Sequence, residues 1–177
     1  MNVEFVHLPK PRYLDRKQDA HLFDALQLYE VGYDIANGQP LPEPDFKHLD
    51  KIFFKDFVHD TIDYQVHAGI IDNKVCAMAR FDPHPRLSGH SNIEEITVHP
   101  EYRRQGIAKR LIGYLGGIAL ANNKHSLQLR VANPELEPYY EKLGFRRNEI
   151  IPANPNQPFM AINANVAVQL NKLQFAS

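Results

Sequence analysis

The sequence predicts an α/β layer fold with a mixed sheet, in a single domain that spans residues 1–177, and three observations lead to this expectation. The length of 177 residues is close to that of one domain. Hydrophobic residues make up 44% and charged residues 23%, which is ordinary globular usage and excludes disordered and fibrous classes. The apolar residues change period along the chain, in the order strand, two helices, hairpin, strand, helix, strand, helix, strand.

The chain begins with a predicted strand and two predicted helices. Residues 2–8 alternate as in a short strand. Asp19 is the expected N-cap of a first helix that ends at Gly38, and Pro44 lies early in a second helix. The apolar residues expected along these helices are Leu22, Phe23, Leu26, Tyr29 and Tyr33, then Phe46, Leu49, Ile52, Phe53 and Phe57.

After the second helix the apolar period becomes two. Residues 64–70 and 75–81 each alternate, and Asp72-Asn73-Lys74 between them is typical of a turn. These residues therefore predict a β-hairpin. Residues 82–91 contain two prolines and a glycine, which indicates a loop.

The second half of the chain contains the clearest helical pattern. Residues 93–98 predict a strand, and residues 104–121 predict an amphipathic helix. Gly113, Gly116 and Gly117 each cost that helix about 1 kcal/mol relative to alanine. We therefore expect them to let a neighbouring backbone approach.

Further elements follow that helix. Residues 127–131 predict a strand, residues 134–143 a short helix with Gly144 as its C-cap, and Phe145 the start of another strand.

The tail, residues 151–177, is only loosely assigned. Residues 159–162 favour a strand, whereas the apolar spacing over residues 166–173 fits a helix and a strand equally. Because this pattern is unassigned, the tail is also where we would expect an exchanged or interface strand if the chain forms a homodimer.

Composition narrows the partners. A formal net charge of −1 argues against a nucleic-acid partner, and the sequence has no run of 18 apolar residues that would predict a membrane span. The first residues carry no export signal, so a cytoplasmic location is expected. Cys76 has no second thiol to pair with, and the nine histidines show no ligand spacing, so no metal site is expected.

The segment from Val98 to Ala108 carries the chemistry. A strand ends, a short loop follows, and a helix begins, so unpaired backbone N–H groups at the helix start can bind an anion. Gly106 leaves room for a phosphate near the backbone, and Arg103 and Arg104 add positive charge. The segment is neither a P-loop nor the dinucleotide fingerprint. It predicts a pyrophosphate cradle, with an ordinary basic helix cap as the alternative.

Two motifs at these positions resemble one family. Arg103-Arg-Gln-Gly-Ile-Ala108 is similar to the [RQ]-x-x-G-x-[GA] motif of the GNAT superfamily of acetyl-CoA-dependent N-acetyltransferases. Asn133 and Tyr140, in Tyr140-Glu-Lys-Leu-Gly-Phe145, resemble the family's N-x(6)-Y-x-x-x-G-F. The element order fits the family from residue 2 to about 150.

The resemblance implies a GNAT-like domain. Its central sheet would be mixed and mostly antiparallel, flanked by helices, with two splayed parallel strands at its centre. Acetyl-CoA would be the co-substrate, with its pyrophosphate on the backbone of residues 104–109 and its pantetheine arm along residues 96–98. The residues that the resemblance assigns to acetyl-CoA are Ile96, Thr97, Val98, Arg103, Arg104, Gln105, Gly106, Ile107, Ala108, Lys109 and Asn133.

The same resemblance assigns catalytic roles. The acceptor amine would attack the thioester directly in a ternary complex, with Tyr140 as the acid that protonates the leaving thiolate. Glu94 is the candidate base and Glu95, on the other strand face, a candidate substrate contact. A water chain in place of the base remains open. Gln128 stands where some relatives that acetylate protein N-termini have a glutamate. Because an amide is not a useful proton acceptor, this residue argues against a protein N-terminus as the acceptor.

The acceptor and the role remain open. An amine-bearing small molecule, a protein lysine and a protein N-terminus all fit an N-acetyltransferase. The alternatives are an acetyl-CoA-binding regulatory or sensor module with little catalysis, and an interaction protein whose cradle arises by chance.

Overall fold

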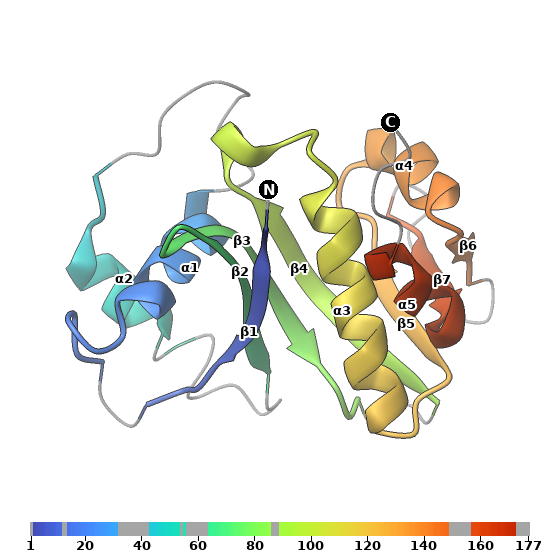
Figure 1. The fold of residues 1–177 in the computed structure, drawn as a ribbon, viewed down its shortest axis with the longest axis horizontal. Coiled ribbons are helices and arrows are strands. Elements are labelled where there is room, and N and C mark those ends of the chain that lie inside the picture. The colour runs from blue at the N-terminus through green and yellow to red at the C-terminus, as the bar shows by residue number, and fades with distance from the viewer. Residues whose placement is uncertain are drawn as a thin grey trace. The chain divides into compact units, whose positions relative to one another are not determined.

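The computed structural model describes residues 2–11, 14–31, 43–53, 55, 64–85, 89–148 and 157–172. The strands are β1 (Glu4–Leu8), β2 (Gln65–Ile71), β3 (Lys74–Asp82), β4 (His90–Val98), β5 (Ser126–Arg130), β6 (Arg146–Arg147) and β7 (Phe159–Asn163) (Figure 1). The helices are α1 (Ala20–Val31), α2 (Phe46–Ile52), α3 (Ile107–Ala121), α4 (Glu137–Lys142) and α5 (Ala164–Lys172). Short 3₁₀ turns, η2 (Pro100–Tyr102) and η3 (Pro134–Leu136), precede α3 and α4.

Within the described residues, seven strands form one sheet in the order β1-β2-β3-β4-β5-β7-β6. The β1–β2, β2–β3, β5–β7 and β6–β7 pairs are antiparallel, and β4–β5 is parallel. This confirms the predicted mixed, mostly antiparallel sheet. The parallel ladder runs from His90–Ser126 to Ile93–Leu129, whereas β4 itself continues to Val98.

The chain divides into two compact units. Unit 1 comprises Met1–Phe81 and Glu95–Ala108, and unit 2 comprises Asp82–Glu94 and Lys109–Ser177. Each unit is described by itself, and a single functional domain over residues 1–177 stays a prediction.

In unit 1, α1 and α2 bury their apolar residues in one core with β2 and β3. The predicted residues Leu22, Phe23 and Leu26 are buried there, and the Phe23 and Phe46 rings meet edge to face at 5.4 Å. The expected positions Tyr33, Gly38 and Phe57 lie outside the described residues.

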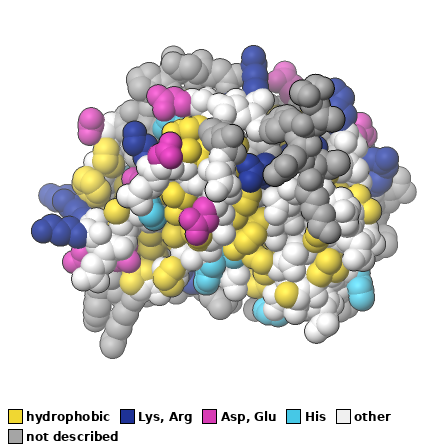
Figure 2. Space-filling model, viewed as in Figure 1, with side chains coloured by type: hydrophobic (Ala, Val, Ile, Leu, Met, Phe, Trp, Pro, Cys, Tyr) yellow, Lys and Arg dark blue, Asp and Glu magenta, His cyan; other side chains and the backbone are white. Residues whose placement is uncertain are grey.

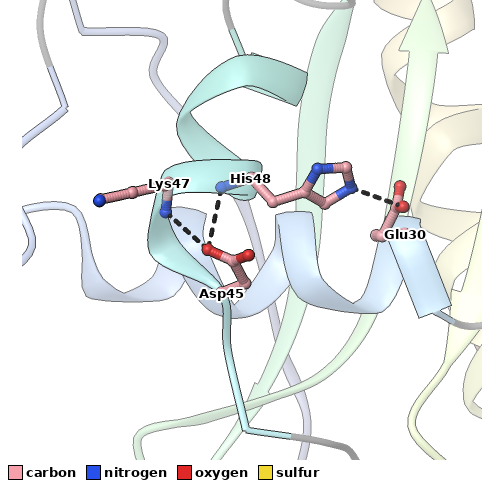
Figure 3. A network of polar contacts seen from close by, with 4 residues as sticks. All are labelled: Glu30, Asp45, Lys47 and His48. Carbon is pink, nitrogen blue, oxygen red and sulfur yellow. Dashed lines mark hydrogen bonds and ion pairs between the residues drawn. The ribbon is translucent and has the colours of Figure 1, made fainter.

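A capping network fixes the start of α2 (Figure 3). The Asp45 carboxylate oxygen Oδ1 accepts hydrogen bonds from the backbone N–H groups of Lys47 (3.1 Å) and His48 (3.2 Å). The His48 ring then lies 2.8 Å from Glu30, which joins α2 to α1. The expectation of Pro44 inside this helix is wrong, because Asp45 is the N-cap and Pro44 precedes it.

The β2–β3 hairpin is confirmed, with one detail changed. Asp72 (φ 48°) and Asn73 (φ 62°) form a two-residue turn of the kind that matches strand twist. Lys74 already pairs with Ile71, so it belongs to β3 and not to the turn. A bulge at Cys76 shifts the register, because Gly69 faces Ala77 while Ile70 faces Val75.

The strand that leads to the cradle is longer than expected. The predicted loop 82–91 is shorter at both ends, since β3 includes Asp82 and β4 begins at His90. The buried Ser91 hydroxyl donates to the Pro83 carbonyl at 3.1 Å, which anchors this start of β4. Residues 86–88 of that loop lie outside the described residues.

Unit 2 places α5 against α3 (Figure 1). A Cβ atom on Gly116 would come within 2.9 Å of the Ala167 Cβ, so the close approach predicted for Gly113 and Gly116 is confirmed. The same expectation for Gly117 is wrong, because its Cβ would meet open space.

The tail is resolved into a strand and a helix. The strand expected at residues 159–162 is confirmed as β7, which pairs with β5 and β6 of the same chain. The two interpretations of residues 166–173 are resolved as far as Lys172 in favour of the helix α5. Residues 149–156 and 173–177 lie outside the described residues.

The helix expected over residues 134–143 divides into η3 and α4. Gly144, with φ 100°, ends α4 as predicted, and the strand expected from Phe145 begins one residue later as β6. None of the described helices has the length and apolar character to cross a bilayer.

Candidate functional site

The loop between β4 and α3, in unit 1, is built on a bonded turn. The His99 backbone N–H donates to the Cys76 carbonyl at 2.9 Å, which ties the end of β4 to β3. His99 is also the N-cap of η2, since its ring Nδ1 accepts the Glu101 backbone N–H at 3.3 Å. The chain therefore leaves the sheet in a fixed direction.

Arg103 closes this turn. Its backbone N–H donates to the Pro100 carbonyl at 3.3 Å, and its side-chain Nε donates to the Val98 carbonyl at 3.1 Å. The side chain is therefore half-buried and directed back to the strand end, whereas the next residue, Arg104, is exposed.

Positive φ angles then delay the helix. Arg104 has φ 63° and Gly106 has φ 74°, a region that glycine adopts freely and arginine rarely does. The predicted helix start at Arg104 is therefore wrong, because left-handed residues cannot continue an α-helix, and α3 begins at Ile107. A non-glycine residue held in this conformation is the kind of local strain that clusters at ligand sites.

The electrostatics of the loop favour an anion. The first turn of α3, which is fully described, holds no acidic residue and includes Lys109 and Arg110. The first N–H groups of an α-helix have no partner within the helix, and the helix dipole makes its start positive. The loop can therefore bind a phosphate or pyrophosphate through its backbone.

The surroundings of His99 favour the neutral form of its ring. Burial lowers the pKa of His99, and the nearby Arg103 and Lys74 lower it further against the opposing Glu101 and Asp24. A neutral ring keeps Nδ1 available as the acceptor that caps η2. The sequence patterns assign His99 no role, because only the fold brings Cys76 and Asp24 beside it.

The two carboxylates of β4 differ in setting. Glu94 is exposed, and Glu95 is half-buried. The Thr97 hydroxyl, on a residue 7% exposed, donates to Glu95 Oε1 at 3.3 Å. Glu95 and Thr97 therefore share one face of β4, and Glu94 points to the other.

In unit 2, Tyr140 lies on α4 and is 8% exposed. Its ring centroid lies 5.6 Å from that of Phe145 and 5.3 Å from that of Tyr139, both edge to face. Partial burial raises the pKa of the neighbouring Tyr139 phenol. Aromatic packing thus fixes the plane of the Tyr140 ring.

Two amides of unit 2 have structural partners. Asn133 is exposed and caps η3, with its Oδ1 accepting the Glu135 backbone N–H at 3.0 Å. Gln128 is buried on β5, and its Oε1 accepts from Asn148 Nδ2 at 3.1 Å.

The structure brings residues 95–108 together in unit 1, whereas Glu94, Lys109, Asn133 and Tyr140 belong to unit 2. No cluster of metal-ligating side chains occurs among the described residues. A cavity of about 510 Å³ in unit 1 is lined by residues that include Glu4, His21 and Asp72, and none of the predicted site residues lines it.

Basic and acidic side chains are interspersed on one face of the molecule. On the face shown in Figure 2, the coloured Lys and Arg side chains lie in several separate places with acidic side chains among them.

The chain is similar to known acetyltransferases in sequence. Residues 24–145 match the family described as the acetyltransferase (GNAT) family. Over 64 residues, 36% of this chain, it is 41% identical to the glucosamine 6-phosphate N-acetyltransferase of Trypanosoma brucei brucei. That match spans 42% of the relative, less than half of its length.

Solved structures share the fold. An acetyltransferase of the GNAT family from Desulfovibrio desulfuricans, described as putative, superposes with a TM-score of 0.61 at 16% identity, over 92% of this chain and 99% of that one. The PaiA N-acetyltransferase of Thermoplasma acidophilum, solved in complex with coenzyme A, has a TM-score of 0.57 at 14% identity, over 92% and 99%. With the family match over most of the chain, these findings show that the protein belongs to the GNAT family of acetyltransferases.

Proposed function

We propose that this chain transfers an acetyl group from acetyl-CoA to an amine acceptor, by direct attack in a ternary complex. The observation that carries the proposal is the loop between β4 and α3. Arg104 and Gly106 take positive φ angles there, directly before a helix start that holds no acidic residue.

The residues present fit the coenzyme. The backbone N–H groups from Arg104 to Lys109 would hold the pyrophosphate, because a helix start leaves its first N–H groups unbonded. The backbone of Ile96, Thr97 and Val98, together with Asn133, would hold the pantetheine arm. Gly106 has no side chain to fill the cradle.

The proposed chemistry uses two proton transfers. When bound, acetyl-CoA supplies the acetyl group as a thioester. Tyr140 donates its phenolic proton to the leaving thiolate, since a phenol is protonated at neutral pH. Glu94 takes the proton of the attacking amine, directly or through water, and Glu95 contacts the acceptor.

The acceptor is an amine of a small molecule or of a protein. The similarity to the trypanosomal enzyme makes glucosamine 6-phosphate the first acceptor to test. A protein lysine is the next, and a protein N-terminus comes last because of Gln128. We further propose that the protein acts in the cytoplasm. We also propose a homodimer, and light scattering at working concentration tests it.

The first experiment is a thermal melt with and without acetyl-CoA. At a hundredfold excess over Kd, binding stabilises the fold by about 2.7 kcal/mol, which corresponds to a rise of roughly 5–10 °C. The rise should disappear in Gly106→Val. An assay of free thiol release over the amine panel then measures transfer, and the absence of any shift at millimolar acetyl-CoA would contradict the proposal.

A second function follows from the packing of Tyr140. Its low exposure and its contacts with Phe145 and Tyr139 also suit a core residue. The alternative is an acetyl-CoA-binding regulatory module. Tight binding of acetyl-CoA without thiol release on any amine would favour it.

A further inference from the structure

We infer that Arg103 is a positioning residue that holds the Val98–His99 peptide unit at the head of the cradle, and that its charge is not what binds the coenzyme. The inference rests on the proposed function, because it assigns a role within the same site. It concerns unit 1 alone, where all of its contacts lie.

The Val98–His99 peptide is held at both of its polar ends. Its carbonyl oxygen accepts from Arg103 Nε at 3.1 Å, and its N–H donates to the Cys76 carbonyl at 2.9 Å. A peptide unit is planar, so fixing the oxygen and the N–H fixes the rotation of the whole plane. The end of β4 is therefore set from β3 on one side and from Arg103 on the other.

The Arg103 side chain also closes the turn that contains η2. The chain leaves β4 at Val98 and turns through Pro100–Tyr102, and the Arg103 side chain returns to the starting carbonyl. The His99 imidazole stabilises the same turn, because its Nδ1 accepts the Glu101 backbone N–H. Arg104, the first residue of the cradle with positive φ, follows directly, so the position of Arg103 sets where the cradle begins.

Arg103 and Arg104 are neighbours with the same charge and different settings. Arg103 is half-buried with its Nε bonded to the backbone, whereas Arg104 is exposed. A charge acting through water is screened by salt, whereas a partly buried hydrogen bond is screened much less. Ionic strength therefore separates the two roles.

Three variants separate the hydrogen bond donated by Arg103 Nε from the charge of the side chain. Glutamine places its Nε2 the same number of bonds from Cα as arginine Nε, so Arg103→Gln keeps a donor and removes the charge. Methionine has the same length and no donor, so Arg103→Met removes both. Arg104→Met is the matched control for loss of charge alone.

The binding experiment is titration of coenzyme A into wild type and the three variants at low and high salt. We expect Arg103→Gln to bind within about threefold of wild type and Arg103→Met about tenfold more weakly at both salt concentrations, as for loss of one hydrogen bond. Arg104→Met should lose affinity mainly at low salt.

A readout without ligand tests the inference independently of binding. Hydrogen exchange of the His99 amide should accelerate in Arg103→Met, and should match wild type in Arg103→Gln and Arg104→Met. If wild type fails to bind coenzyme A, the proposed function fails while the exchange rates still decide the role of Arg103. Equal weakening by Gln and Met, abolished by salt and with unchanged His99 exchange, would overturn the inference.

Discussion

Gly113 of α3 lies so close to Asn171 of α5 that a Cβ atom on the glycine would come within 2.4 Å of the Asn171 backbone nitrogen. The obstacle is backbone, which cannot rotate away as a flexible side chain can. Two helices of unit 2 therefore meet at a distance that only glycine allows at this position.

Gly113→Ala is expected to destabilise the fold. Overpacking costs about 1–3 kcal/mol, and the gain of about 1 kcal/mol in helix propensity offsets only part of it. Gly117→Ala is the matched control, because its Cβ would meet open space and only the propensity gain applies. Thermal melts should show Gly113→Ala below wild type and Gly117→Ala at or above it, and the reverse order would contradict this packing.

The glycines of α3 show which features of the helix packing can be predicted from the sequence. Their pattern predicted a close approach without naming the partner, because the spacing in the tail fits a helix and a strand equally. Gly117 is a glycine inside the same helix as Gly113 and Gly116, yet it faces solvent. The direction of each glycine depends on where α5 lies, which is a tertiary relationship.

The residue types predict where the proposed cradle lies, but they do not predict its backbone geometry. The spacing of apolar residues predicts a helix from Arg104. It cannot reveal that Arg104 has a positive φ, because the spacing does not depend on the backbone angle of a polar residue. The roles of the Val98 carbonyl and of Cys76 depend on backbone groups, which are identical in every residue. The motif residues are visible in the sequence, whereas the hydrogen bonds that shape the loop are visible only in the fold.

The Asp45 cap gives a local stability prediction. Asp45→Ala leaves the backbone N–H groups of Lys47 and His48 without their acceptor, which should cost about 1 kcal/mol. The melting temperature should then fall by about 2–4 °C. Asp45→Asn keeps a capping oxygen and should melt near wild type. A loss shared equally by both variants would assign the effect to charge.

Tyr140→Phe separates catalysis from packing. The phenylalanine ring keeps the contacts with Phe145 and Tyr139 and lacks the proton, so turnover should fall by about a hundredfold or more. The Kd for acetyl-CoA and the melting temperature should stay near wild type. Tyr139→Phe, in the adjacent ring, should leave turnover nearly unchanged.

Unchanged turnover in Tyr140→Phe would contradict its role as the acid. The buried ring would then be a core residue, and the regulatory module would become the better interpretation. A parallel loss of turnover and acetyl-CoA affinity would instead indicate that the phenol supports binding.

His67 predicts how stability depends on pH. It is buried on β2, and burial followed by the charge of nearby His7 lowers its pKa to about 3. In an unfolded chain a histidine pKa is about 6.5, so between these values the unfolded state binds more protons. The contribution is therefore fully present above pH 6.5 and is lost as the pH falls toward 3.

Urea unfolding at pH 7, 6 and 5 measures this slope. Below pH 6, wild type should lose up to about 1.4 kcal/mol per pH unit through His67, in addition to the losses from other groups. His67→Gln cannot titrate, so its unfolding free energy should fall less steeply, whatever its value at pH 7. His7→Gln removes the neighbouring charge but leaves burial, the larger cause, so it should keep most of the slope. Parallel slopes in wild type and His67→Gln would mean that the ring is hydrated and titrates as in the unfolded chain.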